Sequence, residues 1–354
     1  MTDGLGVDYQ RGRYVIVYYN GKYYGIHDLR ERNNEYYYET KYGYDPNDID
    51  LLATTSSGTD EASAGSATDY KAMLDWLQTN ELSSDANYQK IADQVDVDNY
   101  MNYMQAEMFV NNGDWPHNNM KKWRVASQKS KWKWFLYDLD FGFGVSYNTQ
   151  NGNVFSYVTN ANGTNGMGMG MGQWGGQQSS GSISPHTILM IRLLGNEGFK
   201  KAFINRYCVL LSMNFAPARL LKMIEELQSQ VQPEMARDLE FWGLDASSIS
   251  NNLEKIKSFA QTRQQTIVSE MQTYFNLGET VPVTLSVQGS GHILVHNLEL
   301  DANSLQVNFF RDVPVTVTAV ATSGGVFSGW SDGVTDAMRT FNPGEVTTLT
   351  ASFR

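Results

Sequence analysis

The sequence predicts an α+β protein with a β-containing N-terminal part, a mostly helical central part and a small all-β domain at the C-terminal end. Three observations lead to this fold class. Residues 14–29 carry a hairpin pattern, residues 69–275 carry mainly helical periodicity, and residues 283–354 alternate apolar and polar residues in short segments between turn residues. A chain of 354 residues is long enough for two or three units, each with its own core.

The N-terminal hairpin is predicted by a turn dipeptide between two strand-forming segments. Tyr14 to Tyr19 is rich in β-branched and aromatic residues, and Lys22 to Leu29 forms the return strand. Asn20 and Gly21 both tolerate the positive φ that a tight two-residue turn requires. We expect this hairpin to be the only β-rich element in the first hundred residues, and residues 53–68, rich in Ser, Thr, Gly and Ala, are typical of a loop.

Helical periodicity with suitable caps predicts the elements of the central part. Asp69, Ser84 and Asp96 are candidate N-terminal caps, because their side-chain oxygens can accept hydrogen bonds from free backbone N–H groups of the first turn. Methionine and aromatic side chains at helical spacing are interpreted as core. The predicted helices span residues 70–79, 85–93, 97–110, 187–194, 198–214, 216–242 and 248–275.

Two strands are expected within this helical part, at Lys121 to Ala126 and at Lys131 to Leu136, joined by a polar turn. Residues 148–182 come after them and contain alternating Gly and Met from Gly166 to Gly172. We interpret residues 148–182 as a mobile insertion, although its alternating methionines could also bind a soft metal ion.

The C-terminal domain is predicted by an abrupt change of composition at Gly278 to Pro282. Phe327 and Trp330 are expected to be core residues, because a unit this small needs large aromatic side chains to bury enough apolar area. The segment from Phe327 to Gly333 is similar to a small β module of bacterial surface repeats, which is commonly appended to exported proteins. The strands predicted here span residues 283–287, 292–296, 313–321 and 347–353.

Charge and hydropathy exclude some functional classes. The net charge of −11 argues against a nucleic-acid-binding surface, and no run of apolar residues is long enough for a transmembrane helix. The single cysteine, Cys208, excludes an intramolecular disulfide and is expected to pack as a small hydrophobic residue in a buried helix. One basic cluster is either two solvated strand faces or a positive field beside a phosphate site. It consists of Lys121, Lys122, Arg124, Lys129, Lys131 and Lys133.

Two segments carry residues suited to phosphoryl transfer. Residues 111–119 place Asp114 on a Gly/Pro loop five residues before Asn119, and residues 131–144 place Asp138 and Asp140 after an apolar strand. Phosphoryl transfer needs one Asp to orient the attacking hydroxyl, an Asn that helps to hold a metal ion, and a second Asp that bridges this metal to the phosphates. The spacing from Asp114 to Asn119 equals that of a protein-kinase catalytic loop, and Asp140 begins the tripeptide Asp-Phe-Gly.

The individual roles of these residues leave alternatives open. Asp114 either orients a substrate hydroxyl or caps its own loop as an Asx turn, and Asn118 is expected to hold the loop. His117 is interpreted as a structural hydrogen-bonding residue, with a base or metal ligand as the alternative. In an extended strand Asp138 and Asp140 would point the same way and repel each other, which makes a metal ion between them the natural explanation.

At this point the chain resembles the spore coat protein H (CotH) kinase family, a group of atypical protein-kinase-like proteins. The resemblance is carried by residues 18–25, 29–32, 48–52, 111–119 and 131–144. It implies a kinase-like domain over residues 1–280, with a small β lobe in about residues 1–52 and a mostly helical large lobe, followed by the all-β domain at 283–354. It also implies that sequence preceding Met1, with any export signal, is missing here.

The resemblance further implies ATP as the phosphate donor and Mg²⁺ or Mn²⁺ as the metal, held by Asn119, Asp138 and Asp140, with Asp114 as the catalytic residue. The Val-Ala-Ile-Lys motif and the Gly-rich loop of standard kinases are absent from the sequence. Arg30 and Arg32 are therefore candidates for the phosphate-binding cation and Glu31 for its acidic partner, with a solvated charged turn as the alternative reading of residues 30–32.

The sequence thus predicts a metal-dependent atypical kinase that phosphorylates a Ser, Thr or Tyr hydroxyl of a protein substrate, exported to the cell surface or medium. The competing hypothesis is a surface or coat structural protein whose kinase-like fold has lost turnover. A glycosidase is a weaker option, because Asp138 and Asp140 are too close in sequence to flank a sugar bond from two sides.

Overall fold

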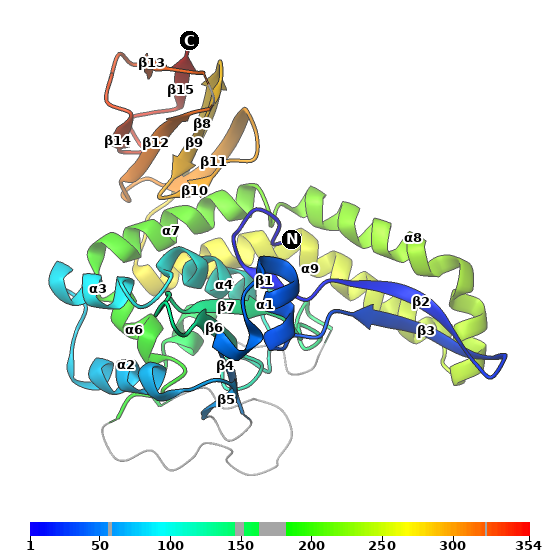
Figure 1. Ribbon diagram of the computed structural model, residues 1–354. Coiled ribbons are helices and arrows are strands. Elements are labelled where there is room, and N and C mark those ends of the chain that lie inside the picture. Colours follow the sequence, from blue (N-terminus) through cyan, green and yellow to red (C-terminus); the bar gives the residue numbers. More distant parts are fainter. Residues whose placement is uncertain (56–58, 146–151, 163–181, 323) are drawn as a thin grey trace.

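The α+β prediction is confirmed by the computed structural model, which describes residues 1–55, 59–145, 152–162, 182–322 and 324–354. A small central sheet is packed among helices, and a separate all-β sandwich follows at the C-terminal end of the chain (Figure 1). Within residues 148–182, predicted to be a mobile insertion, the Gly/Met alternation lies outside the described residues. The prediction is wrong for Val154–Val158, which form a helix with buried apolar side chains.

The central sheet positions the candidate site residues of segments 111–119 and 138–144. It has five strands in the order β1-β7-β6-β4-β5. β6 pairs antiparallel with both β7 and β4, whereas β1 runs parallel to β7. The strands are β1 (Asp8–Tyr9), β4 (Ile49–Thr54), β5 (Asp60–Ala64), β6 (Lys121–Val125) and β7 (Lys133–Leu136).

Each face of this sheet is covered by helix. One face belongs to the large core and includes Trp134, which packs on Tyr100 of α4 (Val97–Val110). The other face forms a smaller aromatic cluster with Tyr37 and Tyr38 of α1 (Glu35–Tyr42). The sheet is therefore held rigidly from both sides, and so are the chain segments that enter and leave its strands.

The remaining helices also contribute to the large core. Cys208 is buried in α7, as predicted, and the side chains of Ser84 and Asp96 cap α3 and α4. Figure 1 shows α8 and α9 as a long antiparallel pair. These helices are α2 (Thr68–Thr79), α3 (Asp85–Ala92), α5 (Val154–Val158), α6 (Ile188–Leu194), α7 (Glu197–Ser212), α8 (Pro217–Trp242) and α9 (Ala246–Phe275), and a short 3-10 helix covers Pro46–Asp48.

The predicted hairpin is present as β2 (Gly12–Tyr19) and β3 (Lys22–Arg30), and it extends along α8 (Figure 1). The side chain of Asp238 accepts a hydrogen bond from the backbone N–H of Ile26 at 2.6 Å. Gly25 has φ +99°, and a Cβ there would lie 2.6 Å from Nε1 of Trp242. This glycine therefore allows the hairpin to lie close against the helix.

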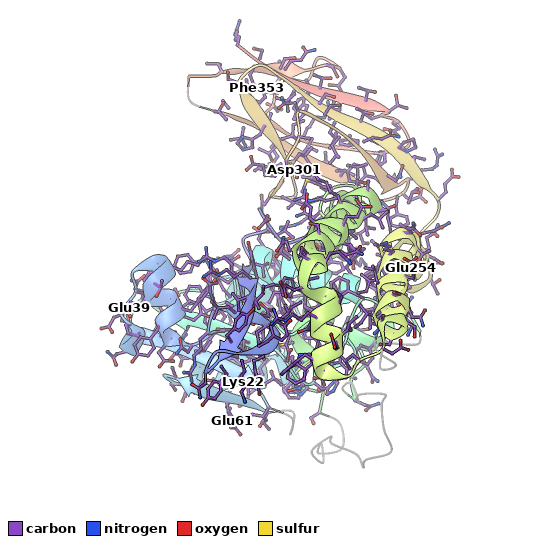
Figure 2. The ribbon with its side chains drawn as sticks, turned by 90° about the vertical axis from the view of Figure 1, so that its right-hand side faces the viewer. Lys22, Glu39, Glu61, Glu254, Asp301 and Phe353 are labelled. Atoms are coloured by element: carbon purple, nitrogen blue, oxygen red, sulfur yellow. The ribbon has the colours of Figure 1, made fainter. Side chains whose placement is uncertain are left out.

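The C-terminal sandwich consists of two four-stranded sheets that rest on α7. Asn205 donates to the carbonyl oxygen of Pro314 at 2.8 Å, and Arg206 donates to that of His296 at 3.2 Å. Figure 2 shows Asp301 at the base of the sandwich, where Arg219 binds it at 2.8 Å. The strands are β8 (Thr280–Gln288), β9 (Gly291–Val295), β10 (Leu298–Glu299), β11 (Ser304–Phe310), β12 (Val315–Ala321), β13 (Phe327–Trp330), β14 (Met338–Phe341) and β15 (Thr348–Phe353).

Several sequence-based expectations about the elements were wrong. The hairpin is not the only β-rich element of the N-terminal part, because β4 is buried in the central sheet and β5 lies inside the predicted loop. β5 is polar and forms by pairing with β4, a contact that local propensity does not reveal. Asp69 does not cap α2, which begins at Thr68; its carboxylate binds Arg124 instead.

The contacts between the sandwich and α7 predict how a shortened chain behaves. We expect a chain that ends at Gly278 to fold and to melt at a lower temperature than the full chain, because Asn205 and Arg206 lose their acceptors in the sandwich. Thermal unfolding followed by circular dichroism measures the difference. An unchanged melting temperature would show that the contacts add no stability, and an insoluble product would contradict the expectation that the central part folds by itself.

Candidate active site

The two segments singled out in the sequence meet at one edge of the central sheet. β6 and β7 are antiparallel, with Lys121 opposite Phe135, so the start of β6 and the end of β7 lie side by side. Residues 111–119 lead into β6, and residues 138–144 follow β7. The pairing therefore brings Asn119 and Asp138 together although 18 residues of chain separate them.

Backbone hydrogen bonds fasten these segments to each other. The N–H of Gly113 donates to the carbonyl oxygen of Phe141 at 3.2 Å, and the N–H of Phe143 donates to that of Val110 at 2.8 Å. A Cβ at Gly142 would lie 2.9 Å from the carbonyl oxygen of Val110, so only glycine fits this crossing without a shift of the backbone. The glycine of the Asp-Phe-Gly tripeptide thus has a local steric role.

Asp114 is held by the amides of its own loop. Oδ2 of Asp114 accepts hydrogen bonds from Nδ2 of Asn118 and Nδ2 of Asn119, both at 3.0 Å. Nε2 of His117 lies 3.8 Å from the other carboxylate oxygen, and burial lowers the pKa of His117, which favours the neutral imidazole. These contacts fit the expected loop-holding role of Asn118 and fix the Asp114 carboxylate in a half-buried position.

Asp138 lies near other acidic groups. Strand alternation, the reason that the sequence suggested, does not explain this placement. β7 ends at Leu136 and Asp138 has a left-handed backbone with φ 57°, so strand alternation does not align it with Asp140. Burial first, and then the charges of Asp140 and Asp114, raise the pKa of Asp138, while the Arg30 cation and a hydrogen bond from Asn119 oppose this shift. The three carboxylates therefore share one electrostatic environment.

The donor atoms of this cluster fit a hard divalent cation. Carboxylate oxygens of Asp138 and Asp140 and the amide oxygen of Asn119 are ligands of the type that Mg²⁺ and Mn²⁺ accept. Within the described residues, no three His, Cys, Asp or Glu side chains form a metal cage by themselves. A metal ion held here would therefore need further ligands, such as amide and phosphate oxygens.

A polar pocket of about 500 Å³ adjoins the acidic cluster. Its walls include Lys121, two residues after Asn119, and Tyr137, directly before Asp138. Asn33 is 9% exposed and lines the pocket, and neither polar atom of its side chain has a hydrogen-bond partner. Buried amides are normally paired, so Asn33 points to a ligand that supplies the missing partners.

Two cations, Lys121 and Arg32, line this pocket together with one carboxylate, Glu35. Nζ of Lys121 donates to the carbonyl oxygen of Asn33 at 3.1 Å and lies 4.9 Å from the centre of the Tyr137 ring. Burial and the nearby Arg32 cation lower the pKa of Lys121. In a chain of net charge −11, two cations that repel each other at the wall of a pocket are suited to a phosphate group.

The other charged candidates have different partners. Glu31 binds Arg11, and Arg30 binds Asp28 at 2.8 Å while its charge also reaches Asp138. Within the basic cluster, Lys122 and Arg124 are buried in ion pairs with aspartates, so they do not form a solvated strand face. Of the two interpretations of the basic cluster, the positive field beside a phosphate site fits Lys121.

A comparison with protein families identifies the group to which the chain belongs. The family model described as "CotH kinase protein" matches residues 1–267, about three quarters of the chain. The chain belongs to the CotH kinase family. A search of curated proteins found no match to it. Family membership makes it a kinase-like protein, in agreement with the site residues at 111–119 and 138–144.

No helix in the described part of this CotH-family chain combines the length and the apolar character needed to cross a membrane.

Sequence reasoning missed three residues of the site. Lys121 was considered only as a member of the basic cluster, and Asn33 lies between the charged residues 30–32 and the unpredicted helix α1. Glu107 was hidden in α4, where its helical spacing resembles that of the core residues around it. The one sequence feature that pointed to Glu107 was its place as a glutamate in an otherwise apolar turn, Ala106 to Val110.

Glu107 is fully buried beneath the CotH-family site. Burial raises the pKa of its carboxyl from 4.5 to about 8, and the nearby charge of Asp138 adds to this, while polar contacts with Asn112 and Tyr103 oppose it. At neutral pH the group is therefore mainly protonated and uncharged.

The raised pKa of Glu107 predicts a pH-dependent stability. Between about pH 4.5 and 8 the folded state binds a proton that the unfolded state has lost, so the free energy of unfolding falls as pH rises, by up to about 1.4 kcal/mol per pH unit from this group. Glu107→Gln cannot ionise and should lose this contribution. Urea unfolding of wild type and Glu107→Gln near pH 4.5 and near pH 8 measures this contribution to the free energy of unfolding. The same difference between the two proteins at both pH values would contradict a buried, neutral Glu107 carboxyl.

Proposed function

We propose that this CotH-family protein is a divalent-metal-dependent kinase that transfers the γ-phosphate of ATP to a hydroxyl group of a protein. The observation that supports this most strongly is the juxtaposition of the acidic cluster around Asp138 with the cationic pocket around Lys121. Phosphoryl transfer between two oxygen atoms requires both: cations that bind the donor's phosphates, and carboxylates that hold a metal ion and orient the acceptor.

The pocket is the proposed nucleotide site. Its volume of about 500 Å³ lies within the range of typical small-molecule sites. Lys121 and Arg32 would bind phosphate oxygens, and the amide of Asn33 would pair with a polar group of the nucleotide. Lys121 would thus fill the position of the lysine that standard kinases carry in the Val-Ala-Ile-Lys motif. Arg30, whose charge reaches Asp138, is placed to stabilise charge on the transferred group.

Asn119, Asp138 and Asp140 would hold Mg²⁺ or Mn²⁺. The ion neutralises phosphate charge and fixes the orientation of the γ-phosphate. The raised pKa of Asp138 fits this role, because carboxylates that repel one another are stabilised in the ionised form by a cation. The amide nitrogen of Asn119 binds Asp114 and also donates to Asp138, so the amide would turn to place its oxygen on an ion shared with Asp138.

Asp114 would position the acceptor. The acceptor oxygen forms a bond to the γ-phosphorus while the bond from this phosphorus to the oxygen shared with ADP breaks, and the hydroxyl proton passes to the Asp114 carboxylate. The hydrogen bonds from Asn118 and Asn119 fix the carboxylate, and Oδ1 receives no hydrogen bond from either amide. This oxygen is the one that we assign to the substrate hydroxyl.

The family is compatible with a protein substrate, and we propose a Ser, Thr or Tyr acceptor. We also propose that the protein is exported, because the segment around Trp330 is similar to bacterial surface repeats. A non-catalytic surface or coat protein is the second candidate. One observation favours it: both amides that hold Asp114 come from its own loop, as they would in a purely structural turn.

The assigned roles predict different losses for two variants. Asp114→Asn should lower the rate of phosphate transfer by about 100- to 10,000-fold and leave ATP affinity nearly unchanged, because Asp114 contacts the acceptor hydroxyl. Lys121→Ala should instead weaken ATP binding. Transfer of labelled phosphate to an acceptor protein and calorimetric titration of ATP with Mn²⁺ measure the two effects.

Asp75→Asn is the matched control, because Asp75 is an exposed carboxylate on α2. Asp75→Asn should change neither the rate of phosphate transfer nor the affinity for ATP. Equal phosphate incorporation by wild type and Asp114→Asn would remove Asp114 from the mechanism. Wild type that binds ATP with Mn²⁺ and transfers no phosphate to any acceptor would favour the non-catalytic alternative.

A further inference from the structure

A buried glutamate lies directly beneath the catalytic loop. Glu107 is in the last turn of α4, and none of its surface is exposed. Oε2 of Glu107 accepts a hydrogen bond from Nδ2 of Asn112 at 3.1 Å, whereas Oε1 has no hydrogen-bond partner. Asn112, which is 2% exposed, is the second residue after α4.

Asn112 joins the two halves of the site. Its Nδ2 also donates to the backbone carbonyl oxygen of Asp138 at 3.3 Å, and its Oδ1 accepts the backbone N–H of Asp114 at 3.3 Å. One amide side chain therefore links the proposed catalytic residue to a proposed metal-binding residue. The hydrogen bond to Glu107 fixes the orientation of this amide, because Nδ2 must point toward both Glu107 and Asp138.

Burial of Glu107 has no obvious benefit for stability. The neighbouring residues Ala106, Met108 and Phe109 belong to the large hydrophobic core, and Oε1 of Glu107 stays unpaired there. The carboxyl has polar contacts only with Asn112 and Tyr103 among the interactions that shift its pKa toward its usual value. An unpaired buried polar group lowers the stability of the folded state. Residues that break the rules of core composition in this way are most often kept for a functional site.

We propose that Glu107 is a positioning residue, which orients Asn112 and through it sets the relative placement of Asp114 and Asp138. The catalytic part of this proposal rests on the proposed kinase function, whereas the ordering of the two loops does not. Glu107 contacts neither substrate nor metal in this role. Its uncharged form suffices, because a neutral carboxyl or carboxamide oxygen accepts the hydrogen bond from Asn112 equally well.

Three variants test this role. Glu107→Gln keeps the acceptor oxygen, and Glu107→Leu replaces it with an apolar group of similar volume. Gln105→Leu is the matched control: Gln105 is also fully buried in α4 and has one unpaired oxygen, but its amide binds the carbonyl oxygen of Phe203 on α7. This control therefore removes a buried polar group of the same helix that does not contact the catalytic loop.

Hydrogen–deuterium exchange of the full-length proteins gives a readout that does not depend on activity. In Glu107→Leu, exchange should accelerate in residues 111–119 and 137–144, while the rest of the core keeps its protection. Glu107→Gln should match wild type in both segments, and Gln105→Leu should change only the contact between α4 and α7. Unchanged exchange in the two segments of Glu107→Leu would overturn the proposal, as would equal loosening in Gln105→Leu.

Kinetics with ATP, Mn²⁺ and an acceptor protein test the catalytic consequence. Glu107→Leu should lower kcat by about 10- to 100-fold with little change in the KM for ATP, and Glu107→Gln should restore most of the activity. Asn112→Ala should lower kcat similarly, and adding Glu107→Leu to it should cause little further loss, because both act through one amide. Full activity of Glu107→Leu, or a Glu107→Gln variant as impaired as Glu107→Leu, would contradict the positioning role.

These two readouts separate the proposals. If wild type transfers no phosphate and Glu107→Leu still loosens both segments, Glu107 orders the loops and the proposed kinase function fails. If wild type is active and Glu107→Leu leaves both exchange and kcat unchanged, the kinase function stands and the positioning role fails.

Discussion

The site depends on the antiparallel pairing of β6 with β7. This pairing places the loop that precedes β6 beside the segment that follows β7, and it thereby brings Asn119 to Asp138. Backbone hydrogen bonds around Gly113 and Phe143 then lock the two segments to the end of α4. Because helices cover both faces of the sheet, the positions of the functional groups follow from packed elements and not from flexible loops alone.

Electrostatics divide the site into two adjoining regions of opposite charge. On one side, burial and then the charges of Asp140 and Asp114 raise the pKa of Asp138. On the other side, Lys121 and Arg32 share a polar pocket in a chain of net charge −11. A divalent cation bound to phosphates would relieve both kinds of repulsion, because its positive charge faces the carboxylates and the phosphates face the basic side chains.

The sequence predicted those features that depend on local pattern. Turn chemistry at Asn20 and Gly21, helical periodicity, and the caps at Ser84 and Asp96 are local, and the structure confirms them. Motif spacing and family resemblance predicted a site within residues 114–140, and the pairing of β6 with β7 brings the two segments of this candidate site together. Strand β5 and the partners of Lys121 depend on contacts between distant segments, and single-sequence patterns do not encode such contacts. Strand alternation does not align Asp138 with Asp140, because the strand ends before both of them.

The central claim is that one metal–nucleotide complex lies between the acidic cluster and the basic pocket. Crystals of the full-length protein with Mn²⁺ and a non-hydrolysable ATP analogue test it most directly, because anomalous scattering at the manganese edge locates the ion. We expect one peak among Asn119, Asp138 and Asp140, with the phosphates extending toward Lys121 and Arg32. A manganese peak away from these three residues, or a nucleotide bound outside the pocket, would contradict the account.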